Sequence, residues 1–93
     1  MTIMPPPQYD FPPAVPVIEH AVEQAEVMRI CGDQTGCARI FKDRCEIWFP
    51  RAGVWITFTG GTPGGAVMPA WAAEQIRRHE LAHCNGWSKD HRG

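Results

Sequence analysis

The chain has 93 residues, with 9 lysines and arginines, 10 aspartates and glutamates, and a formal net charge of −1. One small domain is therefore the upper limit, and the near-neutral charge without basic clusters argues against a nucleic-acid partner. The apolar runs are too short to cross a bilayer, so no membrane partner is expected. Length and composition leave the oligomeric state open.

The cellular location is indicated by two features that point in different directions. Residues 1–7 have neither basic residues nor an apolar core of the signal-peptide kind, which leads us to expect the cytoplasm. Four cysteines are compatible with an exported or periplasmic protein instead. Cys31 and Cys37 flank a turn-like loop and are expected to lie close together, which leaves Cys45 and Cys84. Three pairings are formally open, and buried reduced cysteines are the alternative.

Residues 1–16 form a proline-rich segment. Its prolines are Pro5, Pro6, Pro7, Pro12, Pro13 and Pro16. Proline fixes φ and removes a backbone donor, so we expect an extended arm outside the core. Residues 17–93 are expected to form the single domain. The arm either lines the functional cleft or is a simple tail.

The first predicted element of the domain is a helix over residues 17–28. Apolar residues recur there at intervals of three or four, and Pro16 suits the first turn of a helix. Two brief strands separated by turn residues are expected next, over residues 27–31 and 38–41.

Further strands are expected in the middle of the chain. Residues 45–49 are rich in aromatic and β-branched residues, and residues 54–59 alternate in polarity. Residues 50–53 are expected to form a hairpin loop between them. Residues 60–65 contain four glycines and predict a flexible loop, either a rim of the cleft or a plain connector.

The last predicted helix covers residues 69–85 and is rich in good helix formers. Gly86 fits the left-handed position just past a helix end, where a side chain is penalised. Trp87 is then placed to pack back on Leu81 or Ala82. This stop allows the final residues to fold back toward the helix.

The predicted helix contains the sequence His79-Glu80-Leu81-Ala82-His83. Residues four apart lie on one face of a helix, so His79 and His83 can bind one zinc ion. Glu80 projects beside such a metal, where it can hold and deprotonate a water molecule. The alternative is a solvated helix face with two incidental histidines.

The motif continues as H-E-x-x-H-x-x-G, with Gly86 as its last residue. This stretch resembles the zincin metallopeptidases, in particular the group with the pattern H-E-x-x-H-x-x-G-x-x-H. The resemblance covers only the last part of the chain. It implies an α+β fold reduced to a minimal zincin-like domain, with a backing helix, a small twisted sheet and a metal-binding helix.

The third metal ligand departs from the family pattern. The family's third histidine corresponds to Lys89, which is a poor zinc ligand at neutral pH. The ending Gly-Trp-x-x-Asp-His is similar to that of minimal bacterial and phage zincins, which favours His91. Asp90 is the alternative ligand, or it accepts a hydrogen bond from a ligand imidazole.

The resemblance implies a zinc-dependent peptidase that acts on peptide or protein substrates. His79, His83 and His91 would hold Zn²⁺, and Glu80 would be the general base. An edge strand would bind the substrate main chain. The alternatives are a non-catalytic zinc-stabilised binding module and a zinc hydrolase acting on another bond. The candidates for the donor that stabilises the reacting carbonyl oxygen are Tyr9, His20, Arg51 and Arg92.

Overall fold

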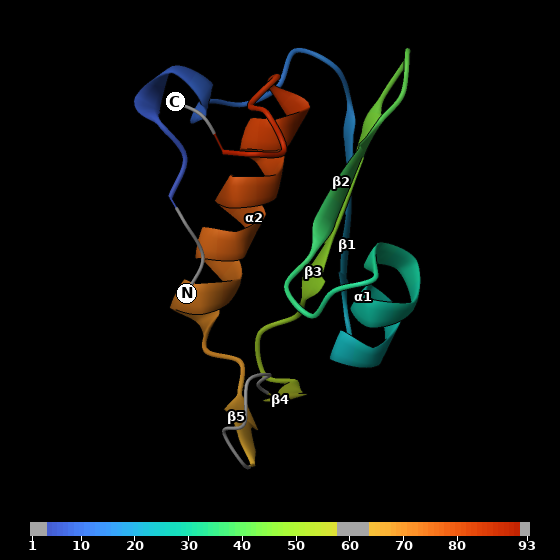
Figure 1. Ribbon diagram of the computed structural model, residues 1–93, viewed down its shortest axis with the longest axis vertical. Coiled ribbons are helices and arrows are strands. Elements are labelled where there is room, and N and C mark those ends of the chain that lie inside the picture. The colour runs from blue at the N-terminus through green and yellow to red at the C-terminus, as the bar shows by residue number, and fades with distance from the viewer. Residues whose placement is uncertain (1–3, 58–63, 92–93) are drawn as a thin grey trace.

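The computed structural model describes residues 4–57 and 64–91, which form an α+β domain. Its elements in chain order are η1 (Pro7–Tyr9), β1 (Val17–Val22), α1 (Gln24–Cys31), β2 (Cys37–Ile40), β3 (Cys45–Pro50), β4 (Trp55–Thr57), β5 (Gly65–Val67) and α2 (Ala70–Cys84). A sheet with the strand order β1-β3-β2 lies between the two α-helices, and β4 and β5 form a second small sheet at one end (Figure 1). The expected α+β class is therefore confirmed.

Strand β3 is the centre of the larger sheet. It pairs in parallel with β1, from Val17 opposite Cys45 to Val22 opposite Pro50, and antiparallel with β2. Ile47 and Phe49 belong to the hydrophobic core, and both are buried. The strand expected over residues 45–49 is confirmed, and the strand expected over residues 38–41 is confirmed within one residue.

The helix expected over residues 17–28 is wrong in its first half. Residues Val17–Val22 form strand β1, and the helix α1 begins only at Gln24. Val17, Ile18 and Val22 are β-branched and favour extended structure, and pairing with β3 satisfies the backbone of this segment. The apolar spacing of a helix was thus overridden by tertiary pairing. The strand expected over residues 27–31 is also wrong, because that segment lies in α1.

The chain leaves the larger sheet after β3. A turn follows at residues 51–54, but the strand expected over residues 54–59 does not return to β3 as a hairpin would. Its described part, β4, pairs with β5 instead, with Trp55 opposite Val67. Gly65 allows this pairing, since a Cβ atom there would lie 2.2 Å from the carbonyl oxygen of Ile56. Residues 58–63, including most of the expected glycine-rich loop, lie outside the described residues.

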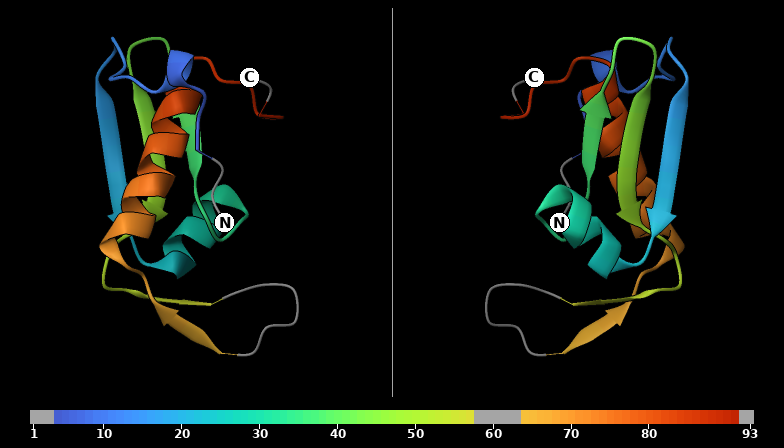
Figure 2. Two further views of the ribbon diagram at one scale, coloured as in Figure 1. Left: turned by 90° about the vertical axis from the view of Figure 1, so that its left-hand side faces the viewer. Right: turned by 90° about the vertical axis from the view of Figure 1, so that its right-hand side faces the viewer.

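Helix α2 covers one face of the larger sheet, and the helix expected over residues 69–85 is confirmed (Figure 2). Ala73 and Ile76 on its buried side join Ile47 and Phe49 in the core. Helix α1 contacts β3 from the side opposite α2, toward one end of the sheet (Figure 1). No helix in the described part of the chain is long and apolar enough to cross a membrane.

The four cysteines form two disulfides. Cys31 is bonded to Cys37, which confirms the expected proximity of these two residues, and Cys45 is bonded to Cys84. The first bridge closes the loop between α1 and β2. The second joins the central strand to the last residue of α2. Two disulfides are compatible with an extracellular location.

The proline-rich arm lies against the C-terminal half of α2 and contains the short helix η1. Asp10 forms an ion pair with Arg78, which holds the pKa of that carboxyl below its ordinary value. Asn85 donates its side-chain amide to the backbone carbonyls of Tyr9, at 2.9 Å, and Phe11, at 2.6 Å. These contacts anchor the arm near the end of the helix.

The two disulfides are expected to contribute unequally to stability. Replacing Cys45 and Cys84 by alanine removes a link between residues 39 apart in sequence. Chain entropy predicts a loss of about 4 kcal/mol in the free energy of unfolding for this pair, and of about 2.5 kcal/mol for Cys31 and Cys37. Urea unfolding of both double variants measures the difference. A larger loss from the shorter bridge would contradict it.

Candidate metal centre

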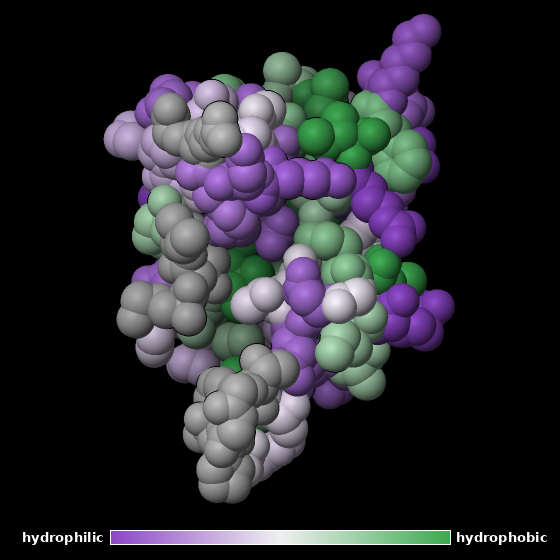
Figure 3. All heavy atoms as spheres, viewed as in Figure 1, coloured by the Kyte–Doolittle hydropathy of each residue, from purple (hydrophilic) through white to green (hydrophobic). Residues whose placement is uncertain are grey.

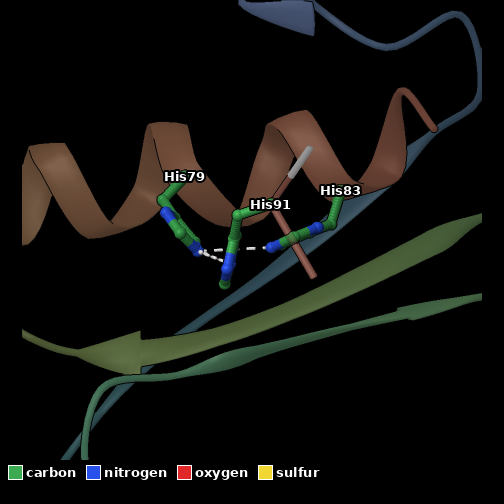
Figure 4. A group of neighbouring side chains, drawn as sticks. All are labelled: His79, His83 and His91. Atoms are coloured by element: carbon green, nitrogen blue, oxygen red, sulfur yellow. Dashed lines mark hydrogen bonds between the residues drawn. The ribbon is translucent and has the colours of Figure 1, made fainter. Parts of the chain in front are cut away.

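Three histidines meet beside the last two turns of α2. His79 and His83 lie one helical turn apart on the side of α2 that faces β2, and His91 returns to them from the C-terminal segment (Figure 4). Gly86 adopts a φ of 99°, which ends the helix and reverses the chain, as expected from the sequence. His91 itself has a φ of 62°, an uncommon conformation for a residue other than glycine. Backbone outliers of this kind concentrate at functional sites.

The three imidazoles direct their Nε2 atoms to one point. The Nε2 atom of His79 lies 3.2 Å from that of His83 and 3.1 Å from that of His91. In a tetrahedral site with zinc–nitrogen distances of about 2.0–2.1 Å, two ligand nitrogens lie about 3.3–3.4 Å apart. The arrangement therefore fits a small divalent cation with three nitrogen ligands, which leaves one position for a water molecule or a substrate.

The orientation of His83 is fixed by its other ring nitrogen. Nδ1 donates a hydrogen bond of 2.8 Å to the backbone carbonyl of Trp87, which leaves the lone pair on Nε2 directed at the other histidines. The Trp87 ring is 3% exposed and stacks on His83 at 5.0 Å between centroids. Burial lowers the pKa of His83 despite this hydrogen bond, so the neutral, cation-binding form is favoured.

Trp87 was expected to pack back on the helix at Leu81 or Ala82. Its backbone amide does donate to the carbonyl of Ala82, at 3.0 Å. Its ring, however, also lies edge-on against His79 at 5.0 Å. Trp87 is therefore part of the site as well as part of the helix cap. The sequence feature that could have indicated this role is the position of the tryptophan directly after the capping glycine.

Glu80 opens onto the same cavity as the histidines and is only 5% exposed. Burial, and secondarily the negative charge of Asp33, raises the pKa of Glu80 to about 8. A cation held by the histidines would favour the charged form and lower this pKa again. The carboxyl group is thus placed among groups that control its proton affinity.

The cavity has a volume of about 450 Å³ and lies between α2 and the edge strand β2. The three histidines and Glu80 form one wall, and Cys37, Ala38 and Ile40 of β2 contribute to the other. Gly36 makes this close approach possible. A Cβ atom at Gly36 would lie 2.4 Å from the Trp48 carbonyl oxygen and 3.2 Å from Glu80 Oε2.

The remaining candidates are dispersed. Asp90 accepts a hydrogen bond from Ser88, and its carboxylate is not one of the three converging groups. His20 stacks on Trp48 on the sheet face away from α2, and Arg51 pairs with Glu23. Tyr9 lies in the arm, where its carbonyl accepts from Asn85. Arg92 lies outside the described residues.

Among the described residues, Lys89 is the only lysine or arginine that lines the cavity. The sequence predicted only that Lys89 is a poor zinc ligand. Its position two residues before His91, on a segment that returns to the helix, was the available signal for a role in the site.

Comparisons of the chain with protein families, with curated proteins and with solved structures found no match. The class of the protein therefore follows from its own fold and site. It is a small α+β domain with two disulfides and a three-histidine centre that fits a metal ion.

The centre is expected to bind one zinc ion per chain. Replacing His79, His83 or His91 by alanine should abolish stoichiometric binding, because two imidazoles hold zinc far less tightly than three. Elemental analysis after chelation and reconstitution at neutral pH measures this.

The fourth histidine provides the control for this experiment. His20 lies on the other face of the sheet, so His20→Ala should keep full zinc content. Retention of zinc by His91→Ala together with its loss in Asp90→Ala would make Asp90 the third ligand.

Proposed function

We propose that this protein is a minimal zinc-dependent peptidase of the zincin type, acting on peptide or protein substrates. One observation carries the proposal. Three imidazole nitrogens converge on the same cavity onto which the buried Glu80 opens. Three ligands, rather than four, are typical of catalytic zinc sites. The motif H-E-x-x-H assigns the same roles to these residues.

The donor set fits zinc, because imidazole nitrogens suit this metal and the spacing of the Nε2 atoms fits tetrahedral geometry. When bound, zinc lowers the pKa of a coordinated water toward neutrality and polarises a carbonyl group. Glu80 would accept a proton from the attacking water as the new carbon–oxygen bond forms. It would then donate that proton to the leaving amine as the carbon–nitrogen bond breaks.

Strand β2 would align the substrate. It is an edge strand whose neighbour is β3, and no further strand among the described residues pairs with its other side. Cys37 and Ala38 of this strand line the cavity. An extended peptide can add to such an edge through main-chain hydrogen bonds, which tolerates many side chains. The scissile bond would then lie between β2 and the histidines.

Lys89 would supply the positive charge that the reacting carbonyl oxygen needs. It lines the cavity, whereas Tyr9, His20 and Arg51 do not. Its charge also disfavours protonation of His83. An ammonium group at this position can stabilise a developing negative charge on oxygen.

Glu80→Gln tests whether the protein is an enzyme. The substitution keeps the size of the side chain but removes the group that accepts a proton. Zinc content should be unchanged, whereas turnover should fall by about 10² to 10⁴. The assay is hydrolysis of broad peptide libraries by the zinc-loaded proteins, with a chelator control.

Two outcomes would contradict the proposal in different ways. If the zinc-loaded wild type cleaves no peptide, a non-catalytic zinc-stabilised binding module or a hydrolase for another bond replaces the peptidase. If Glu80→Gln is as active as the wild type, the role of Glu80 is wrong although an enzyme remains.

Lys89→Met tests the proposed charge on the reacting oxygen. Methionine keeps most of the side-chain length and removes the charge, so kcat should fall by about 10² while zinc content is retained. Lys42→Met is the matched control, because Lys42 is exposed in the turn between β2 and β3 and does not line the cavity. An equal effect of both variants on kcat would exclude the role of Lys89.

A further inference from the structure

A second cavity adjoins the first at the other end of α2. It has a volume of about 880 Å³ and lies between α1, the β4–β5 sheet and the N-terminal half of α2. Volumes of this size are typical of ligand sites. In the space-filling view, hydrophobic side chains are visible deep in a hollow near the middle of the molecule, with hydrophilic residues above it (Figure 3).

The two cavities are adjacent to each other. Asp33, Thr35 and Ile76 line both of them. Ile76 lies on α2 one turn before His79, and the other two residues belong to the loop that precedes β2. A peptide bound along β2 at the histidines would therefore have its neighbouring residues next to the second cavity.

The distance between the second cavity and the histidines determines which substrate residue can place its side chain in that cavity. Ala72 lines the second cavity and precedes His79 by seven residues on α2. A helix rises about 1.5 Å per residue, so the two positions are about 10 Å apart along the axis. An extended chain advances about 3.3 Å per residue, so about three substrate residues cover this distance.

The lining of the second cavity selects an apolar side chain. Met28, Val67 and Trp71 are large hydrophobic residues that line it and are exposed. No lysine or arginine lines it among the described residues, so an acidic side chain would find no positively charged partner there. Exposed apolar surface inside a concave site is characteristic of ligand binding.

The rim of this cavity is held in place. Gln24 at the start of α1 accepts a hydrogen bond of 2.8 Å from the Thr57 backbone amide and donates one of 3.1 Å to the Thr57 carbonyl. These bonds tie α1 to β4 on the side opposite α2. The part of the cavity wall that α1 and β4 form is therefore held together by hydrogen bonds.

We infer that the second cavity is the subsite for one large apolar side chain of the polypeptide substrate, about three residues from the scissile bond. This assignment rests on the proposed peptidase function. Main-chain contacts with β2 do not distinguish between substrate side chains, and the subsite would supply that selectivity. The side chain enters between Met28, Val67 and Trp71, while the backbone of the same substrate lies along β2.

The first experiment uses decapeptides of alanine, glycine and serine in which a single phenylalanine is moved along the chain. Zinc-loaded protein should cut them at a fixed spacing of two to four residues from the phenylalanine. The kcat/KM should exceed that of the peptide with serine at this position by about tenfold or more. Mass spectrometry locates each cut.

Variants of the lining test the same preference. Met28→Gln and Val67→Thr keep the shape of these exposed side chains and remove apolar surface, so the preference for phenylalanine should fall severalfold. Ile18→Thr is the matched control, because Ile18 is 43% exposed, close to the 44% of Met28, and lines neither cavity. An equal fall in all three variants would overturn the subsite.

The second experiment measures binding without cleavage. The same peptides are added to zinc-loaded Glu80→Gln while the nuclear magnetic resonance signals of the Trp71 indole and the Met28 methyl group are followed. The phenylalanine peptide should shift both signals, and the serine peptide should not.

Together the two experiments separate the subsite from the peptidase function. Cleavage that is independent of the phenylalanine position, with no shift at Trp71, overturns the subsite and leaves the peptidase function in place. Shifts at Trp71 without cleavage by the wild type reject the peptidase function and leave an apolar peptide-binding groove. The absence of both cleavage and shifts overturns both.

Discussion

The bond between Cys45 and Cys84 holds the end of α2 against the central strand β3, one residue after His83. A domain of this size has a small core, and a covalent link at this point restricts how far the helix can move from the sheet. The spacing between α2 and β2 depends on that restriction, because β2 is paired with β3. The width of the cavity between the histidines and the edge strand therefore follows from the position of this bridge.

The C-terminal segment completes the site by returning to the helix that it has just left. Gly86 reverses the chain, and the Trp87 carbonyl then accepts the hydrogen bond from His83. The Trp87 ring contacts the rings of both His79 and His83, so the residue that caps the helix also supports the ligands. His91 reaches the same point four residues later. Residues 86–91 therefore end the helix, provide the third histidine and support the other two histidines.

The wall opposite the histidines comes from a different part of the chain. The bridge between Cys31 and Cys37 constrains the loop that contains Asp33 and Gly36. Gly36 has no side chain, so Glu80 and the backbone of β3 can both lie close to it. The same loop separates the metal centre from the apolar cavity beside β4 and β5. The loop before β2 therefore borders both cavities.

The local features of this protein could be predicted from the sequence. Helix α2, the glycine stop, strand β3, the proximity of Cys31 to Cys37 and the shared helix face of His79 and His83 follow from spacing and residue type, which act over a few neighbours. His91 was favoured by the resemblance to minimal zincins and not by spacing. The tertiary structure was needed to show that Val17–Val22 is a strand, that β4 pairs with β5, and that Trp87, Gly36 and Lys89 line the cavity. These features depend on contacts between segments that are far apart in the sequence, and a local pattern does not contain such contacts. Pairing with a distant segment can also override the intrinsic propensity of a residue.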